Sequence, residues 1–150
     1  MTAKPIVELI EADLTGSVIG AFYDVYNELG FGFREYVYSR ALERVLIAKG
    51  HCVDREVNVN VYFRGELLTR ERADMIVDRK LIVENKAGER LRPDATPQLF
   101  GYLCATIFEV GLVLHYGREP RPYRVICENR YKMHSLRVRA AERELADEPT

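Results

Sequence analysis

Cysteine is scarce in this 150-residue sequence. The three cysteines, Cys52, Cys104 and Cys127, are odd in number, and none belongs to a CxxC motif. This argues against a disulfide framework and against a zinc site, because both use several cysteines at characteristic spacings. Free thiols are typical of a reducing compartment, so a cytoplasmic location is expected.

Long apolar runs are also missing. No stretch approaches the ~20 residues of a membrane-spanning helix, and no membrane partner is expected. Residues 1–11 contain Glu8 and Glu11, whereas a secretory signal would have a basic segment followed by an apolar one. There are no internal repeats and no Gly/Ser-rich linker, which predicts a single domain over residues 1–130. Residues 131–150 are charged and weakly patterned, as in a peripheral helix or a flexible tail.

An excess of basic charge is absent from the chain as a whole. The net charge of −1 excludes a strongly basic nucleic-acid-binding protein. Residues 118–139 differ, because they hold seven arginines and lysines against two glutamates, a local net charge of +5. Two interpretations stay open for this segment: a solvated surface, or a patch that faces phosphate groups.

Hydrophobic periodicity predicts the order of helices and strands. Apolar residues three or four positions apart predict a helix that starts near Val7 and ends before Gly30 and Gly32. A second helix follows over about 33–49. Strands are expected over about 53–63, 67–77, 81–86, 110–115 and 123–127, with a helix over about 96–108. The order α-α-β-β-β-α-β-β indicates an α/β fold.

The middle hairpin carries the strongest chemical signal. A turn centred on Arg79 places Asp74 opposite Glu84, because the two acids lie five residues to either side of it. Directly opposed residues have Cβ atoms roughly 4.5–5.5 Å apart. Two carboxylates so close repel each other unless one is protonated or a cation lies between them. Mg²⁺ binds carboxylate oxygens and retains several waters, so a divalent metal site is expected here.

Lys86 lies two residues beyond Glu84 and therefore points to the same side of the strand, while Asn85 points away. A lysine in this place can orient an attacking water or neutralise charge on a phosphate. Asn85 would offer its backbone carbonyl to the metal. The alternative is a solvated surface pair, since a Glu-x-Lys sequence alone is a weak signal.

Glu35 adds a carboxylate from a helix. It shares a helical face with Tyr38 and Leu42, so it is expected to point inward among apolar side chains. A buried carboxylate needs a partner. The alternative is a first-turn acid that the helix dipole favours. Gln98 and Tyr102 lie one helical turn apart, and ordinary packing explains that pair equally well.

Residues 29–38, LGFGFREYVY, resemble the signature of the GxxExxY proteins, with Gly32, Glu35 and Tyr38 at the named positions. Those proteins are grouped in the PD-(D/E)XK nuclease-like superfamily. The likeness spans roughly residues 15–128 and implies a restriction-endonuclease-like core, a mixed central sheet flanked by helices. It continues in order through three further segments, 72–74, 82–86 and 98–103.

The resemblance implies roles for the matching residues. Asp74 and Glu84 would bind Mg²⁺ or Mn²⁺, and Glu35 would complete the site, in part through water. Lys86 would be the catalytic lysine. Asn85 departs from the family, where an apolar residue is more usual. The remaining positions around the site are Gln98, as the helical glutamine, and Tyr38 and Tyr102, as supporting residues.

The expected function is that of a metal-dependent nuclease acting on nucleic acid, DNA rather than RNA. Nothing in the sequence reads bases, so specificity would come from a homodimer or a partner protein. Two alternatives stay open: a non-catalytic nucleic-acid-binding or assembly module on the same fold, and a metal-dependent hydrolase of a small phosphate ester. Candidate contacts to the nucleic-acid backbone are Arg90, Arg92, Arg118, Arg121 and Arg124.

Overall fold

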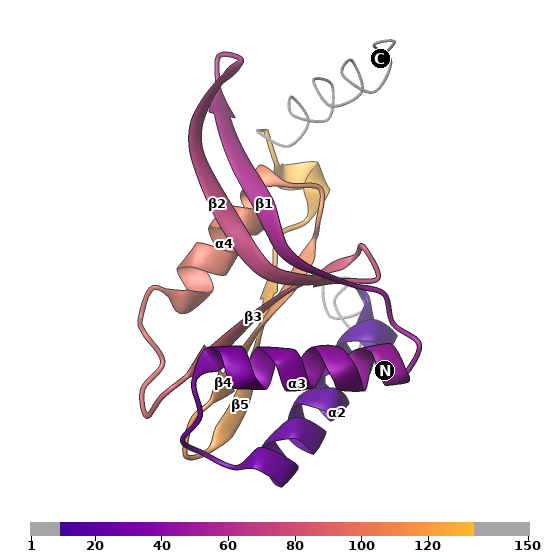
Figure 1. Ribbon diagram of the computed structural model, residues 1–150. Coiled ribbons are helices and arrows are strands. Elements are labelled where there is room, and N and C mark those ends of the chain that lie inside the picture. Colours follow the sequence, from indigo (N-terminus) through magenta and orange to yellow (C-terminus); the bar gives the residue numbers. More distant parts are fainter. Residues whose placement is uncertain (1–9, 134–150) are drawn as a thin grey trace, which may run out of the picture.

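The computed structural model describes residues 10–133, and its elements follow the expected order (Figure 1). The α/β fold class is confirmed. The start of the first helix near Val7 and most of the expected tail over residues 131–150 lie outside the described residues. Across residues 10–133, no helix is long and apolar enough to span a membrane. The elements are α2 (Ala12–Leu29), α3 (Glu35–Ala48), β1 (Val53–Phe63), β2 (Glu66–Val77), β3 (Leu81–Ala87), α4 (Ala95–Ala105), β4 (Val110–Tyr116), β5 (Pro120–Ile126) and the 3₁₀ helix η1 (Asn129–Tyr131).

The five strands form one mixed sheet in the order β1-β2-β3-β4-β5. Only β3 and β4 run parallel, and the connection between them contains α4. Helices α2 and α3 pack on one face through a cluster that includes Phe22 and Leu42, and α4 packs on the other through Leu99 and Leu103. Full burial of a side chain of this size contributes about 1.5–3 kcal/mol. These two apolar layers therefore fix the helices against the sheet.

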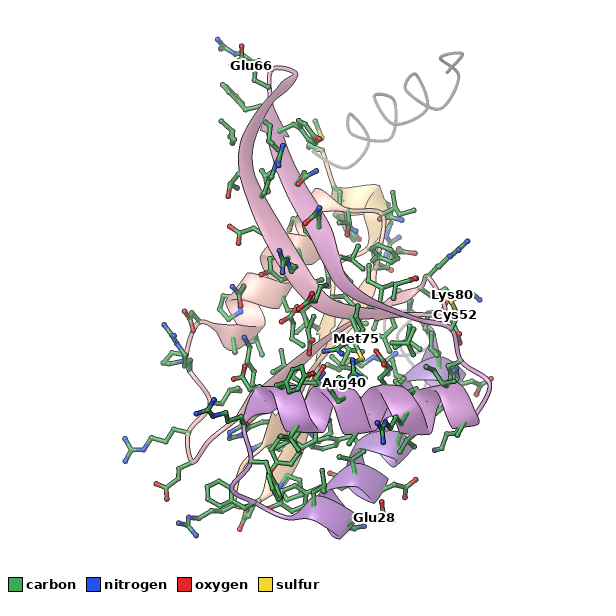
Figure 2. All side chains as sticks on the ribbon, in the orientation of Figure 1. Glu28, Arg40, Cys52, Glu66, Met75 and Lys80 are labelled. Atoms are coloured by element: carbon green, nitrogen blue, oxygen red, sulfur yellow. The ribbon has the colours of Figure 1, made fainter. Side chains whose placement is uncertain are left out.

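The sheet forks at β2. This strand pairs with β1 from Val53↔Val77 to Phe63↔Glu66, but with β3 only from Met75 to Val77. Beyond that point the β1–β2 hairpin leaves the sheet and projects from the rest of the molecule, with Glu66 at its tip (Figures 1 and 2). Arg64 and Gly65 have φ of 50° and 78° at the hairpin turn. Two consecutive positive φ values suit the right-handed twist of a β-ribbon.

Two expected boundaries were wrong. Helix α4 was expected to reach residue 108 but ends at Ala105, because the backbone of Thr106 is extended. Lys132 donates to the carbonyls of Thr106 and Phe108 beyond the helix end, at 3.0 and 2.6 Å. Strand β5 begins at Pro120, earlier than expected from its two prolines. It is an edge strand, where a residue without an N–H is tolerated, and Pro122 pairs there with Leu114.

Candidate functional site

The hairpin register expected from the sequence is confirmed. Met75 pairs with Val83 and Val77 with Leu81, which makes Asp74 and Glu84 the next positions in the same register. Backbone pairing between β2 and β3 ends before these two acids. There the backbone N–H of Asp74 donates instead to Oε1 of the Glu84 side chain at 2.9 Å. Glu84 therefore occupies the fork between β2 and β3.

Strand β1 is irregular opposite Asp74. Glu56 has a left-handed φ of 51°, and regular pairing skips it while continuing on either side. Although Arg55 and Val57 are two residues apart, Arg55 pairs with Glu43 of α3, whereas Val57 packs against the α4 cluster. Such an irregularity re-aims side chains next to it. Because of the irregularity at Glu56, Arg55 reaches α3 on one face of the sheet and Val57 reaches α4 on the other.

The carboxylate of Asp74 accepts hydrogen bonds from α3 and from β3. Ser39 donates to Oδ1 at 3.1 Å, and Asn85 donates to Oδ2 from its backbone N–H at 3.2 Å and from its side-chain amide at 2.5 Å. Ser39 in turn accepts from Arg55 at 3.3 Å. The position of the Asp74 carboxylate is thus set from two elements.

The Asn85 side chain has a larger part than expected. It points away from Glu84 as the strand alternation requires, and it is only 3% exposed. Its amide holds Asp74, and its Oδ1 accepts a 2.8 Å hydrogen bond from the hydroxyl of Tyr116. The sequence signal was an asparagine inside the buried run LIVENKA, since a buried amide needs partners for its polar atoms.

Glu84 is the acid with the most perturbed environment. It is 5% exposed. Burial above all, together with the charges of Asp74 and Glu35, raises its pKa to about 7 against the opposing effects of the Asp74 N–H and of Lys86. Burial and the charge of Glu84 also raise the pKa of Tyr102 to about 12. Acidic groups are therefore crowded at the fork, and Glu84 is the one that retains its proton to the highest pH.

These groups share one cleft of about 260 Å³. The cleft lies between α3, β1, β2 and β3, at the level of Asp74 and Glu84. Figure 2 labels Met75, the neighbour of Asp74 on β2, where the hairpin leaves the sheet. Five residues singled out from the sequence line the cleft, and five others join them. The first set is Glu35, Asp74, Glu84, Asn85 and Lys86; the second is Tyr36, Ser39, Arg55, Glu56 and Arg72.

The expected burial of Glu35 was wrong. It is the first residue of α3 and is exposed at the rim of the cleft, where its Oε1 accepts a 3.4 Å hydrogen bond from the N–H of Ala87. This is the alternative of a first-turn acid, which the helix dipole favours. The periodicity argument failed because the side chain of the first helical residue is not covered by a preceding turn. Its charge still reaches Glu84.

The other expected site residues lie farther out. Gln98 is exposed on α4 and does not line the cleft, and Tyr38 and Tyr102 are buried and also outside its lining. Arg118 pairs with Glu89 at 2.8 Å, Arg121 lies over the ring of Tyr123, and Arg124 donates to the carbonyl of Ile10. The five arginines expected to contact nucleic acid, Arg90, Arg92, Arg118, Arg121 and Arg124, are outside the lining of this cleft.

The donor set fits a hard divalent cation held by two carboxylates. Asp74 and Glu84 supply oxygen ligands, as would the backbone carbonyl of Asn85, and Mg²⁺ commonly takes one or two carboxylates and keeps several waters. The crowding of negative charge around buried Glu84 supports the same ligands. Within residues 10–133 no group of three or more His, Cys, Asp or Glu side chains is close enough to hold a metal, so Glu35 is not a third direct ligand in this arrangement.

Comparison with known proteins gives one family match. A family model described as the PD-(D/E)XK nuclease superfamily matches residues 12–125. A solved structure named "Crystal structure of SSO0001" is 18% identical, with a TM-score of 0.46 over 93% of this chain and 69% of that one. No curated protein matches the sequence.

Proposed function

Because the chain belongs to the PD-(D/E)XK nuclease superfamily, we propose that it is a Mg²⁺- or Mn²⁺-dependent nuclease that hydrolyses phosphodiester bonds in DNA. The observation that carries this proposal is the position of Glu84, which is buried beside Asp74 in a cleft that also holds Lys86. Within the superfamily, the likeness of residues 29–38 supports placement with the GxxExxY proteins.

Asp74 and Glu84 are the proposed metal ligands, with the carbonyl of Asn85 as a third donor. A bound divalent ion supplies positive charge next to the scissile phosphate. Ser39 and the amide of Asn85 keep the Asp74 carboxylate in place through hydrogen bonds of 3.1 and 2.5 Å. Ligands held by such outer contacts need little rearrangement when the ion binds.

Lys86 is the proposed catalytic lysine. It follows Glu84 by two residues on β3, so both side chains leave the strand on the same side and line the same cleft. Its ammonium Nζ can donate hydrogen bonds to an attacking water or to a phosphate oxygen on which negative charge develops. Base recognition would still require a second copy of the chain or a partner protein.

One observation favours a second candidate, a nucleic-acid-binding module without catalysis. The Asp74 carboxylate already has three hydrogen-bond donors, Ser39 and the two nitrogens of Asn85, and these satisfy it without a cation. In that case the cleft would bind the nucleic-acid backbone through its basic side chains, Lys86, Arg55 and Arg72, without a metal ion.

Calorimetric titration of Mn²⁺ and Mg²⁺ decides between the two candidates. The proteins are the wild type, Asp74→Asn, Glu84→Gln, and Glu66→Gln as a matched control whose acid lies at the far tip of the hairpin (Figure 2). Each is also assayed on single- and double-stranded DNA and RNA. The nuclease is supported if the wild type and the control bind metal and cleave, and if Asp74→Asn and Glu84→Gln do neither. Nucleic-acid binding without metal binding or cleavage supports the module.

A further inference from the structure

Three aromatic rings are exposed within six residues at the start of α3. Phe31 is 36% exposed, Phe33 46% and Tyr36 65%. Rings of this size are costly to leave in water, and clusters of them on a surface commonly mark a binding site. Neither the metal ligands nor the catalytic lysine requires them.

Two of these rings lie directly beside the cleft. Tyr36 lines it together with Glu84 and Lys86. An adjoining open hollow of about 440 Å³ lies between the start of α3 and the end of β3. In Figure 1 the α2–α3 connection and the loop after β3 lie on the same side of the molecule. The residues that line the hollow are Phe33, Arg34, Glu35, Tyr36, Ala87 and Gly88, so the cleft and the hollow share Glu35 and Tyr36.

Phe33 and Tyr36 are together called the platform, and its Phe33 ring is held from beneath. Phe33 packs edge-on against the buried ring of Tyr38, with centroids 6.1 Å apart and an angle of 82° between the rings. Its backbone N–H also donates to the Tyr38 hydroxyl at 3.3 Å. A ring fixed in this way loses little conformational entropy when a ligand stacks on it.

Basic side chains surround the platform. The guanidinium groups of Arg40 and Arg55 lie 5.9 and 6.0 Å from the centre of the Tyr36 ring. Within residues 10–133, neither Arg34 nor Arg40 takes part in an ion pair. Arg55 is paired with Glu43, so Arg34 and Arg40 are the arginines available to a ligand. Exposed rings interleaved with such arginines complement a chain that carries both flat bases and phosphate charges.

We propose that Phe33 and Tyr36 stack unpaired bases next to the bond that is cut, so that the substrate is single-stranded nucleic acid. In a duplex each base face is covered by its neighbours, and only an unpaired base can present that face to a side chain. Stacking accepts every base, which agrees with the expectation from the sequence that base specificity would come from a second copy or a partner protein. The inference rests on the proposed function for cleavage, whereas the stacking itself does not.

Binding is tested without cleavage, by fluorescence anisotropy of a labelled oligonucleotide in EDTA at fixed salt. Single strands of DNA and RNA are compared with the DNA duplex for the wild type, Tyr36→Ala, Tyr36→Phe and Phe33→Ala. Tyr131→Ala is the matched control, because Tyr131 is 70% exposed with Arg130 over its ring but lies outside the cleft. A stacking contribution of 1–3 kcal/mol per base corresponds to a loss of roughly 5- to 150-fold in affinity.

Support requires tighter binding of single strands than of duplex, a loss of that size in both alanine variants, and near-wild-type binding by Tyr36→Phe and Tyr131→Ala. Equal binding of duplex and single strands, or single-strand binding that survives Tyr36→Ala and Phe33→Ala, overturns the inference. The nuclease proposal is judged separately by adding Mn²⁺. Cleavage of duplex that is unaffected by Tyr36→Ala would support the nuclease and contradict stacking on the platform. Single-strand binding that depends on the platform, without cleavage, would support stacking and contradict the nuclease.

Discussion

The ring of Tyr38 stacks on the ring of Tyr116, with centroids 4.2 Å apart and 15° between the planes. Tyr38 donates to the carbonyl of Gly30 at 2.5 Å, and Tyr116 donates to Asn85 at 2.8 Å. Since Asn85 also holds Asp74, buried side chains connect the α2–α3 connection to an acid of the cleft. Tyr38 is thus linked to the cleft through Tyr116 of β4 and Asn85 of β3.

Tyr116→Phe tests this connection. The stacked ring remains, but Oδ1 of buried Asn85 loses its donor, so a loss of about 1–3 kcal/mol in the free energy of unfolding is expected. Urea denaturation measures it, and a matched Tyr23→Phe on the exposed side of α2 should change little. Equal stability of Tyr116→Phe and the wild type would contradict the structural role of this hydroxyl.

Asn85→Asp tests the contact between Asn85 and Asp74. A carboxylate replaces an amide whose nitrogen lies 2.5 Å from Oδ2 of Asp74, so two negative oxygens meet in a buried place. We expect lower stability near neutral pH, with partial recovery on acidification or on addition of Mn²⁺. Thermal unfolding with and without Mn²⁺ measures both effects, and Asn58→Asp on the exposed hairpin is the control. A variant as stable as the wild type at neutral pH would argue against the contact.

The fold and the pairing of the two acids could be predicted from the sequence because both depend on local periodicity. Alternating and helical patterns gave the element order, and the symmetric spacing of Asp74 and Glu84 about Arg79 gave the register. Register in a short hairpin follows from its turn, and the turn is encoded by adjacent residues.

The rest depended on where elements meet in space. The burial of Glu35 was misjudged because helical periodicity does not show where the preceding turn is missing. Ser39 of α3 donates to Asp74, and Arg55 of β1, next to the left-handed residue Glu56, donates to Ser39. No spacing along the chain encodes such a meeting of three elements.

We expect Glu84→Gln to be more stable than the wild type by an amount that depends on pH when no metal is present. Burial raises the pKa of Glu84 from 4.5 to about 7, so between these values the folded protein retains a proton that the unfolded chain has released. The wild type therefore loses stability as pH rises through this window, by on the order of 3 kcal/mol at most, and remains penalised above it.

The glutamine variant lacks this penalty. Urea denaturation in EDTA should find the two proteins similar at about pH 5 and the variant more stable at about pH 8. Addition of Mn²⁺ should stabilise only the wild type, because the ligand binds the folded state. A difference between the proteins that is independent of pH would show that Glu84 ionises in the folded protein as it does in the unfolded chain.

Lys86→Ala separates chemistry from metal binding. The lysine lines the cleft with Asp74 and Glu84, but its ammonium group is a donor and cannot be a metal ligand. We expect kcat to fall by on the order of 10²–10³-fold, the usual cost of removing a group that stabilises developing charge. Calorimetry should find Mn²⁺ affinity retained or increased, because a neighbouring positive charge is gone. Lys80→Ala is the matched control, since Lys80 is exposed in the turn at the opposite end of β3 (Figure 2). Loss of metal binding together with activity in Lys86→Ala would instead mean that the lysine holds the cleft together, and its proposed part in catalysis would be lost.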